Sequence, residues 1–490
     1  MPELRPEPVR VPLADVCRTL GVPEQSGVVS GLALDTSCVM AGDLFAALPG
    51  ARTHGARYAQ QAVALGATAI LTDAAGAALL DRVTVPVLVV AEPRAQLGAL
   101  ALRIYAAARP RLVGVTGTNG KTTTTYCIAA AAEAAGLPTA VVGTLGVHFR
   151  ELHHYSGRTT PEAPTLHAAL AAMAEAGAEW GAMEVSSHAL SLHRVDGLSF
   201  AVSAFLGLSQ DHLDFHGSME QYFLAKSRLF EADRSQRAVV NVDDDWGRRL
   251  VQGISIPFAT YGLSPHADWT ARDVTIDGQG STHFTAVGPQ GGVPVIMPLP
   301  GSFNVANALA ALSAVDAMNG DIMVAARGLR DVRVPGRFER IENLRGIAAY
   351  VDYAHTPDAV TRVLEVARAA TSGRLIAVLG CGGDRDQAKR PLMGRAAAAL
   401  ADLTIITDDN PRSEDPAEIR RQVRAELTGD PWVWEIGDRA TAIGAAVAEA
   451  RAGDCVMLLG KGHEAGQEIA GVVYPFDDRV ELSRRLGGEA

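Results

Sequence analysis

The stretch Thr116-Gly-Thr-Asn-Gly-Lys-Thr-Thr123 combines residue types and spacing that can bind a phosphate. A glycine turn between an apolar strand and a helix presents backbone N–H groups and the positive end of the helix to an anion. Lys121 adds a positive point charge, and the Thr122 hydroxyl can serve as a Mg²⁺ ligand. The predicted nucleotide-phosphate site consists of Gly117, Thr118, Asn119, Gly120, Lys121, Thr122 and Thr123.

This stretch is a variant of the strict phosphate loop. That pattern has a glycine five positions before Gly120, where this chain has Val115. The apolar run from Leu112 to Val115 predicts a buried strand, and Thr122 onward predicts an Ala-rich helix that stops at 136–138. A plain strand–turn–helix is the alternative, but it does not explain Gly-Lys-Thr after a glycine turn.

Two motifs with acidic residues or histidines could hold a metal ion. Glu184 ends an apolar strand, so its carboxylate would lie at a sheet edge beside the phosphate loop and could bind Mg²⁺. Helix capping or an ion pair is the alternative role for this glutamate. His212 and His216 have the spacing of a zinc pair on one helix face, although a solvated charge cluster explains them too.

Other polar positions have an ordinary structural explanation beside a chemical one. Lys226 lies in an apolar setting and by itself indicates a surface lysine whose stem covers apolar side chains. Asn304 and Asn307 could bind a purine edge, but capping of the helix predicted to begin there explains them equally well.

The loop Asp409-Asn-Pro-Arg412 carries the groups that are needed to grip an amino acid. Arginine offers a planar fork for a carboxylate, Asp and Asn can hold an ammonium group, and Pro411 restricts the loop. A simple turn is the alternative. Similar polar loops follow other apolar strands, and ligands bind beyond the carboxyl ends of such strands, which predicts a second site. The loops are 352–357, 380–386, 408–412 and 460–464.

Composition limits the class of protein. At about 150 residues per domain, 490 residues predict three domains. The net charge of −11 disfavours nucleic acid and anionic membranes as partners. The 5 cysteines are scattered without metal-binding spacing, and we find neither a signal peptide nor a membrane-spanning run. We therefore expect a cytoplasmic, monomeric protein without membrane insertion.

Alternating strands and helices predict an α/β protein with domains at 1–95, 96–332 and 333–490. The central domain is expected to be a doubly wound parallel sheet, followed between 268 and 299 by an antiparallel appendage with glycine turns. The C-terminal domain is expected to be Rossmann-like. Predicted helices cover 56–65, 94–108 and a stretch from 304 onward. Predicted strands are 68–71, 86–90, 112–115, 139–142, 182–185, 201–206, 238–241, 347–351, 375–379, 403–407 and 456–459.

Taken together, the motifs resemble the ATP-dependent Mur ligases, most closely the MurE branch, from about Asp35 to Val480. That branch adds the third residue of the peptidoglycan stem peptide to UDP-N-acetylmuramoyl-L-alanyl-D-glutamate. The motifs occur here in family order, which makes the resemblance highly specific. They are 116–123, 184–188, 211–217, 352–358, 382–386, 409–412 and 460–464.

The resemblance implies roles for individual residues. ATP phosphates would lie on 117–123, and Mg²⁺ would be held by Thr122, Glu184, His212 and Lys226, with Lys226 carbamylated. Lys121, Lys226 and His212 would be catalytic. Nucleotide contacts across the domain gap would come from Asn304, Arg337 and Asp352. The UDP-sugar peptide would contact Thr36, Thr159, Thr160, Ser186 and Arg194. The incoming amino acid would contact Arg385, Asp409, Asn410, Pro411, Arg412, Gly460 and Glu464.

Two departures from the family pattern affect the UDP-sugar contacts. The usual Asp-Ser-Arg is Asp35-Thr-Ser37, so Thr36 would keep the hydroxyl role while the arginine is lost. By itself, that turn-forming triplet indicates a helix cap more than a ligand site. The family often has glutamine two residues before Arg194, where this chain has Leu192.

The Asn-Pro-Arg form resembles the branch that uses meso-diaminopimelate, whose distal carboxylate Arg412 would clamp. The implied reaction is ATP-dependent formation of an acyl phosphate, followed by attack of an amine. Alternatives are the same reaction with L-lysine or L-ornithine, a folylpolyglutamate synthetase and, from a different class, a P-loop nucleotide-binding regulatory module.

Overall fold

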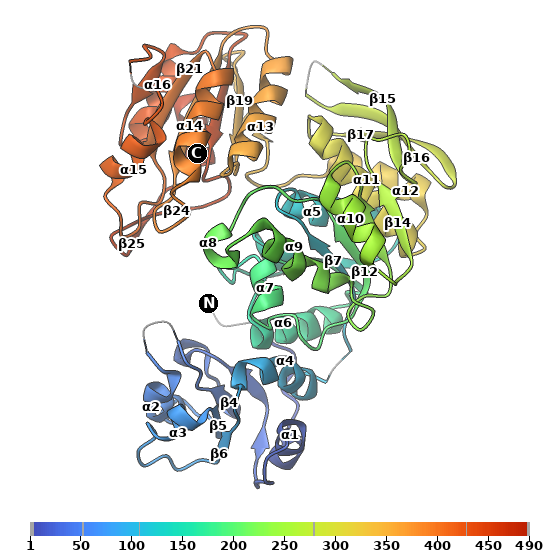
Figure 1. The fold of residues 1–490 in the computed structure, drawn as a ribbon, viewed down its shortest axis with the longest axis vertical. Helices are drawn as coiled ribbons and strands as arrows, with labels where there is room; N and C mark the ends of the chain where they lie inside the picture. Colours follow the sequence, from blue (N-terminus) through green and yellow to red (C-terminus); the bar gives the residue numbers. More distant parts are fainter. Residues whose placement is uncertain (1–3, 51–52, 107, 278–279, 428, 488–490) are drawn as a thin grey trace.

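Three parallel-stranded sheets, one for each third of the chain, define the architecture of this computed structural model (Figure 1). It describes residues 4–50, 53–106, 108–277, 280–427 and 429–487. The α/β class and the three-domain organisation are as predicted. The sheets lie within the three predicted ranges, but the borders at 95 and 332 stay predictions.

The N-terminal domain contains a four-stranded parallel sheet in the order β3-β4-β5-β6. Its helix α4 packs against α1 of the same domain and against α6 (Ala163–Glu175) of the central domain, so α4 joins the two domains. Asp35 caps a 3-10 turn by accepting from the Ser37 N–H, which confirms the capping interpretation. The strands are Gly31–Ala33, Asp43–Ala46, Ala69–Thr72 and Val87–Val89, and the helices α1–α4 are Leu13–Leu20, Ala59–Ala64, Ala74–Ala77 and Pro93–Ile104.

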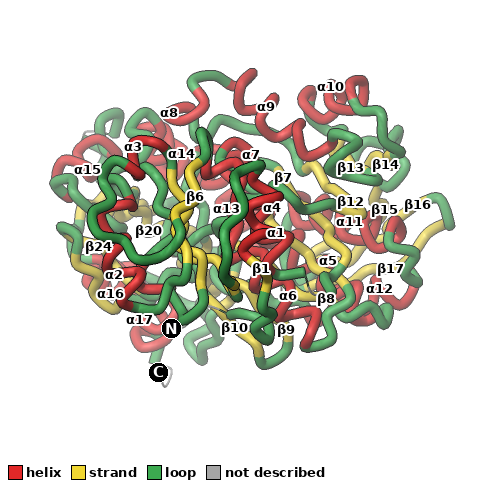
Figure 2. The backbone as a smooth tube through the Cα atoms, turned by 90° about the horizontal axis from the view of Figure 1, so that it is seen from below, coloured by secondary structure: helices red, strands yellow, loops and turns green. Residues whose placement is uncertain are grey.

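The central domain has an eight-stranded sheet in the order β10-β9-β8-β11-β7-β12-β13-β14. Figure 2 shows β9 and β10 on the opposite side of this domain from β13 and β14. From β8 to β14 the strands are parallel, as predicted, but β9 and β10 add an antiparallel edge that the sequence did not reveal. The strands are β7 Arg111–Thr116, β8 Thr139–Gly143, β9 Gly146–Phe149, β10 Leu152–His154, β11 Trp180–Glu184, β12 Phe200–Phe205, β13 Ala238–Asn241 and β14 Phe258–Tyr261.

Helices cover both faces of this sheet, which confirms the doubly wound arrangement. Side chains of α5, α11 and α12 form one core, and those of α6, α7, α9 and α10 contribute to the other. The predicted antiparallel appendage is present as β15 (Thr270–Ile276), β16 (Thr282–Gly288) and β17 (Gly291–Met297). The helices are α5 Lys121–Ala134, α6 Ala163–Glu175, α7 Ser187–Ser191, α8 Leu213–His216, α9 Met219–Ser227, α10 Asp245–Gly253, α11 Ser302–Ala317 and α12 Ile322–Gly328.

The C-terminal domain repeats this design with the strand order β18-β19-β23-β20-β21-β22. β19 to β22 are parallel, and helices again pack on both faces. A hairpin, β24–β25 (Gly466–Ile469 and Val472–Pro475), follows β23. The strands are β18 Glu339–Arg340, β19 Ala348–Asp352, β20 Leu375–Cys381, β21 Leu403–Asp408, β22 Val433–Glu435 and β23 Cys455–Leu459, and α13–α17 are Pro357–Ala370, Lys389–Leu400, Pro416–Val423, Arg439–Glu449 and Asp478–Arg485.

Differences from the predicted elements are mostly at their ends. The helix predicted at 94–108 ends at Ile104, and residue 107 lies outside the described residues, as do residues 278 and 279 of the first predicted glycine turn. The helix predicted at 56–65 begins as a 3-10 turn. None of the described helices is long and apolar enough to cross a membrane.

A buried ion pair closes the C-terminal domain. Arg439 donates to both carboxylate oxygens of Asp478, at 2.7 and 2.6 Å, and both side chains are excluded from solvent. Arg439 Nη2 also donates to the Leu459 carbonyl at the end of β23. The pair therefore links α16 and α17 to the strand end that precedes the Gly460 loop.

We predict that Asp478→Ala lowers the stability of the C-terminal domain by about 3–5 kcal/mol, because it leaves a buried guanidinium without its partner. Glu426→Ala, which removes the exposed partner of Arg395, is the matched control and should cost less than about 1 kcal/mol. Hydrogen exchange of the β19, β20 and β23 amides measures the loss in this domain alone. Equal losses for the two variants would contradict the prediction.

Candidate active site between the central and C-terminal domains

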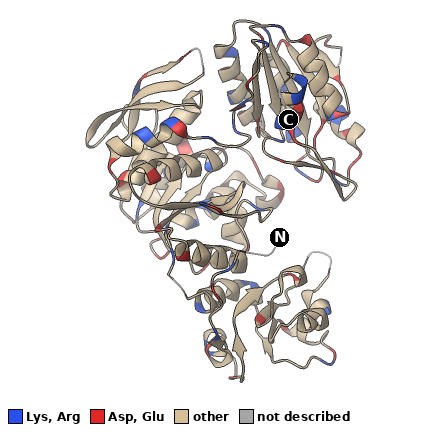
Figure 3. Cartoon of the chain, turned by 180° about the vertical axis from the view of Figure 1, so that it is seen from behind, with Lys and Arg blue, Asp and Glu red and all other residues tan. Residues whose placement is uncertain are grey.

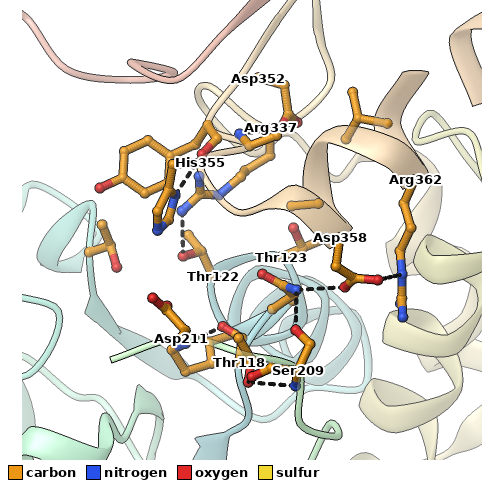
Figure 4. A pocket seen from close by; sticks show the side chains of 18 of the residues that line it. Thr118, Thr122, Thr123, Ser209, Asp211, Arg337, Asp352, His355, Asp358 and Arg362 are labelled. Carbon is orange, nitrogen blue, oxygen red and sulfur yellow. Dashed lines mark hydrogen bonds and ion pairs between the residues drawn. The ribbon is translucent and has the colours of Figure 1, made fainter. Parts of the chain in front are cut away.

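A cavity of about 860 Å³ lies between the central and C-terminal domains (Figure 4). It brings together most of the predicted site residues, although they come from distant parts of the sequence. Those that line it are Thr118, Asn119, Gly120, Lys121, Thr122, Thr123, Thr159, Glu184, His212, Asn304, Arg337, Asp352, Arg385, Asp409, Asn410, Arg412, Gly460 and Glu464. Those outside its lining are Thr36, Gly117, Thr160, Ser186, Arg194, Lys226 and Pro411.

The phosphate loop connects β7 to α5 at the floor of this cavity. Gly120 occupies the N-cap position of α5 with φ +83°, a left-handed conformation that favours glycine. A Cβ built on Gly120 would lie 2.5 Å from Asn307 Oδ1, so the residue needs glycine for space as well. No side chain caps α5 among the described residues, which leaves its first N–H groups available to an anion.

Contacts across the domain gap meet at this loop. Arg337 Nη2 donates to Thr122 Oγ1 at 3.1 Å (Figure 4). The Arg337 guanidinium also lies 4.2 Å from the centre of the Tyr353 ring. Asn119 Nδ2 donates to Asp358 Oδ2, in the first turn of α13, at 3.1 Å. The C-terminal domain therefore already touches the loop in this state.

Two lysines converge on one backbone carbonyl. Lys121 Nζ and Lys226 Nζ each donate to the Gly117 oxygen at 2.9 Å. The Lys226 side chain is only 1% exposed, so the prediction of a surface lysine is wrong. Its position in α9 places it against the strand that enters the loop, where Thr116 Oγ1 is its second partner.

The environment disfavours positive charge on both lysines. Burial, and then the nearby Lys121 charge, hold the pKa of Lys226 well below its ordinary value. Burial also lowers the pKa of Lys121, although Glu184 and Asp211 oppose this. A neutral amine at Lys226 is therefore far more accessible than it would be at the surface.

Glu184 lies at the end of β11, beside the loop, as predicted. Its carboxylate accepts from the Thr144 N–H at 2.8 Å and from the Thr144 hydroxyl at 3.2 Å, and it forms no ion pair within the described residues. The alternative roles as a helix cap or an ion-pair partner are therefore wrong. The Thr122 hydroxyl and the Glu184 carboxylate both line the cavity, and oxygen ligands of this kind suit Mg²⁺.

The predicted zinc pair is not formed. His212 has φ +54° and precedes the one-turn helix α8 (Leu213–His216), so His212 and His216 do not share a helix face. His216 Nε2 instead lies 2.9 Å from Ser187 Oγ. Within the described residues, no three His, Cys, Asp or Glu side chains gather closely enough to hold a metal ion.

His212 keeps a place in the cavity next to Asp211. Its Nε2 is 3.3 Å from Asp211 Oδ2. Removal from water lowers the pKa of His212 to about 4, with Asp211 opposing that shift. The imidazole is therefore neutral at pH 7, which is the form that can bind a metal.

Asn304 and Asn307 do not cap their helix, because α11 begins at Ser302 with Gly301 as its N-cap. Asn307 Oδ1 accepts from Thr124 Oγ1 at 3.1 Å, and Asn307 Nδ2 donates to Asn304 Oδ1 at 3.1 Å. The first of these bonds ties α11 to α5. The capping alternative is therefore wrong, and both residues line the cavity.

Asp352, at the end of β19, is buried and accepts from the N–H groups of Phe338 and Ala354 at 2.6 and 2.7 Å. Burial raises its pKa, whereas Arg337 and the two N–H groups lower it. Its carboxylate thereby shapes the segment that carries Arg337 into the cavity.

Three of the residues predicted to hold the UDP-sugar peptide form a network beside the cavity: Thr160, Ser186 and Arg194. Thr160 Oγ1 donates to the Glu184 carbonyl at 2.9 Å and accepts from the Ser186 N–H at 3.1 Å. Arg194 contacts Glu162, with Nε 3.0 Å from Oε1, and Glu162 also pairs with Arg94. Thr36 lies in the N-terminal domain, in the turn that Asp35 caps.

The C-terminal end of the cavity is lined by residues that were predicted to bind an amino acid. Asn410 Nδ2 donates to Glu464 Oε2 at 2.7 Å, which joins the loops after β21 and β23. Arg412 has φ +52°; its Nη1 donates to the Gly383 carbonyl at 2.7 Å and its Nε lies 3.3 Å from Glu468. The pocket therefore offers both acceptors and a guanidinium.

Several residues of the site were not identified from the sequence. Asp358, Tyr353, Glu162 and Lys461 contact predicted site residues directly. Tyr353, Asp358 and Lys461 lie within the motifs 352–358 and 460–464, so their place in these motifs could have identified them. For Glu162, the signal was its position next to Thr159 and Thr160.

Models of known protein families match three successive stretches of the chain. Residues 28–105 match the "Mur ligase family, catalytic domain", residues 115–315 the "Mur ligase middle domain", and residues 336–462 the "Mur ligase, glutamate ligase domain". The three matches follow the order of the three sheets.

Individual proteins are similar over nearly the whole length. A UDP-N-acetylmuramoyl-L-alanyl-D-glutamate--2,6-diaminopimelate ligase of Streptomyces coelicolor is 49% identical, covering 98% of each chain. The enzyme of the same name from Corynebacterium efficiens is 45% identical over 98% of this chain and 95% of its own. A solved structure of a ligase with that name is 33% identical, covers 98% of this chain and 99% of its own, and has a TM-score of 0.66.

We predict that Gly120→Ala abolishes adenine-nucleotide binding, because the new methyl group would collide with Asn307 and strain the turn. Gly136→Ala is the matched control: it also has positive φ, +76°, but no atom lies within 4 Å of its built Cβ. Calorimetric titration with ADP should show binding for Gly136→Ala only. Wild-type affinity in Gly120→Ala would refute the assignment of the turn.

Proposed function

The chain belongs to the Mur ligase family, and on that premise we propose that it joins meso-2,6-diaminopimelate to UDP-N-acetylmuramoyl-L-alanyl-D-glutamate. ATP is converted to ADP and phosphate in this reaction, which serves peptidoglycan synthesis. The protein would act in the cytoplasm as a monomer.

One observation carries this proposal: one cavity is lined both by the loop before α5 and by Asp409, Asn410, Arg412 and Glu464. A ligase needs a nucleotide, an acid and an amine within reach of one another. A nucleotide-binding regulatory module needs only the first, so the acceptors and the guanidinium at the far end of the cavity favour the ligase. Folylpolyglutamate synthetase, another alternative, would use no UDP-muramyl peptide.

In the proposed mechanism, the γ-carboxylate of the D-glutamyl residue attacks the γ-phosphate of ATP, and ADP leaves. The neutral amine of the third amino acid then attacks the carbonyl carbon of the acyl phosphate; phosphate leaves, and the nitrogen loses a proton. Lys121 and the N–H groups at the start of α5 would offset the repulsion between the two anions. Arg337 would reach the nucleotide from the C-terminal side, so domain closure would complete the site.

Mg²⁺ fits the side chains that are present, and we propose Thr122, Glu184 and His212 as its ligands. Mg²⁺ typically binds one or two carboxylates together with substrate phosphates, so a site without a cluster of three acidic or histidine side chains is compatible with it. When bound, the ion would neutralise charge on the phosphates. Thr122 would exchange its contact with Arg337 for this role.

We propose that Lys226 is carbamylated by CO₂. The reaction needs a neutral amine, and the lowered pKa of Lys226 favours that form. Carbamylation would also remove the repulsion between two ammonium groups, because Lys121 and Lys226 both donate to the Gly117 carbonyl. A carbamate would turn one of these two cations into an anion beside Lys121.

For the third amino acid we propose meso-diaminopimelate, with its distal carboxylate on Arg412. The guanidinium already lies near a carboxylate, that of Glu468, on the hairpin β24–β25. L-Lysine and L-ornithine lack this distal carboxylate and would leave the guanidinium without its ligand.

We predict rapid phosphate release from ATP only when the UDP-muramyl dipeptide and meso-diaminopimelate are both present. Arg412→Met should raise the KM for diaminopimelate by about 10- to 100-fold, the loss expected for a charge-assisted hydrogen bond. Arg395→Met, an exposed arginine of the same domain, is the control. Efficient turnover of L-ornithine by the wild-type protein would contradict the assignment of Arg412.

We also predict that Lys226→Ala removes most ligation while ADP binding is retained, because the lysine lies behind the loop and outside the cavity lining. If the carbamate is the active form, chloride or formate should partly restore the rate by supplying an anion. Wild-type rates in Lys226→Ala would rule out the carbamate. Loss of activity without any rescue would argue for the ammonium instead.

A further inference from the structure

Lys461 is a buried lysine in the amino-acid end of the site that the proposed mechanism does not use. Its side chain is 0% exposed and does not line the cavity, although its neighbours Gly460, His463 and Glu464 do. Burying a lysine is costly unless its ammonium group is well paired. The partners of the Lys461 ammonium group therefore indicate its role.

Two of the three partners of Lys461, Asn410 and Glu464, line the cavity. Nζ donates to Asn410 Oδ1 at 3.2 Å, to Glu464 Oε2 at 3.3 Å and to the Gly466 carbonyl at 2.6 Å. These groups come from the loop after β21, the loop after β23 and the first residue of β24. One ammonium group thus joins the three segments that surround the predicted amino-acid pocket.

These contacts fix how Asn410 is oriented. Asn410 Oδ1 accepts from Lys461 and also from the Glu468 N–H at 2.9 Å, so the oxygen must face the hairpin. Asn410 Nδ2 then faces Glu464 and donates to its Oε2. If the amide were flipped, an NH₂ group would face two donors.

The same contacts make the two oxygens of the Glu464 carboxylate different. Oε2 receives both protein donors, whereas Oε1 accepts no hydrogen bond from the described residues. Because Glu464 lines the cavity, Oε1 is left for a ligand donor. Burial and the nearby Asp409 raise the pKa of Glu464, and Lys461 counteracts that shift.

We propose that Lys461 is the positioning residue of the amino-acid pocket. From behind the cavity wall it holds Asn410 and Glu464 so that Glu464 Oε1 accepts from the ammonium group at the distal end of the incoming diamino acid. This inference rests on the proposed ligase function, because that function supplies the diamino acid. Lys461 itself does not touch the substrate.

The test is Lys461→Met, which keeps the apolar stem and removes the ammonium group. We expect the KM for meso-diaminopimelate to rise by about tenfold or more, as for loss of a hydrogen bond to a buried charge. The KM for ATP, the ADP affinity and kcat at saturating diaminopimelate should change less than about threefold, since these depend on other groups.

A pH profile separates positioning from a merely structural role. Without the Lys461 charge the pKa of Glu464 should rise further, so the acid limb of kcat/KM for diaminopimelate should move to higher pH. In a double-mutant cycle, Lys461→Met should cost little once Glu464 is replaced by Gln. Lys461→Arg, which keeps the charge, should place the acid limb near that of the wild-type protein.

Asp454→Ala is the matched control, since Asp454 is also buried but precedes β23 at the end opposite to Lys461. It accepts from the Arg374 and Arg451 N–H groups, so its loss should lower thermal stability without changing the KM or the pH profile. An unchanged KM and acid limb in Lys461→Met, with the wild-type protein active, would overturn the inference. A wild-type protein that does not use diaminopimelate would instead refute the proposed function.

Discussion

The N-terminus of α5 is the constraint on which the rest of the active site depends. Gly120 turns the chain in a conformation that other residues rarely adopt, and no side chain caps the helix among the described residues. Free N–H groups therefore point into the cavity, and neighbouring elements must leave room for an anion. Asn307 packs directly over the turn, while Arg337 and Asp358 reach it from the C-terminal side.

Two lysines meet at the loop. Lys121 and Lys226 donate to one carbonyl, and burial of both disfavours two ammonium groups there. Elsewhere the two signs of charge alternate: Figure 3 shows basic and acidic residues interspersed along the ribbons of all three domains. The two lysines at the loop are therefore a local feature of the site.

Much of the fold could be predicted because its signals are local. Apolar runs such as 375–379 and 403–407 gave strands, and the polar loops after them line the cavity. The burial of Lys226 could not be predicted from its local pattern, because its partners lie far away in the sequence: Thr116 ends β7, and Gly117 begins the loop after it. The spacing of His212 and His216 predicted a zinc pair on one helix face, and this prediction was wrong. The left-handed backbone of His212 places it before the helix and not in it.

The C-terminal pocket shows the same limit. The motif containing Lys461 was identified, but the role of its lysine depends on three segments that only the folded chain brings together. The antiparallel edge strands β9 and β10 are short and carry histidines, so they lack the apolar pattern that revealed their parallel neighbours. Residue-level roles at the cavity stay predictions for the same reason: they depend on ligands as well as on the chain.

The central claim is that ATP bound at the α5 turn converts a carboxylate into an acyl phosphate before the amine attacks. The most direct measurement uses UDP-N-acetylmuramoyl-L-alanyl-D-glutamate labelled with ¹⁸O in its γ-carboxylate. The mechanism predicts that the phosphate released with meso-diaminopimelate carries one ¹⁸O atom from that carboxylate. Unlabelled phosphate, released while the peptide bond forms, would contradict it.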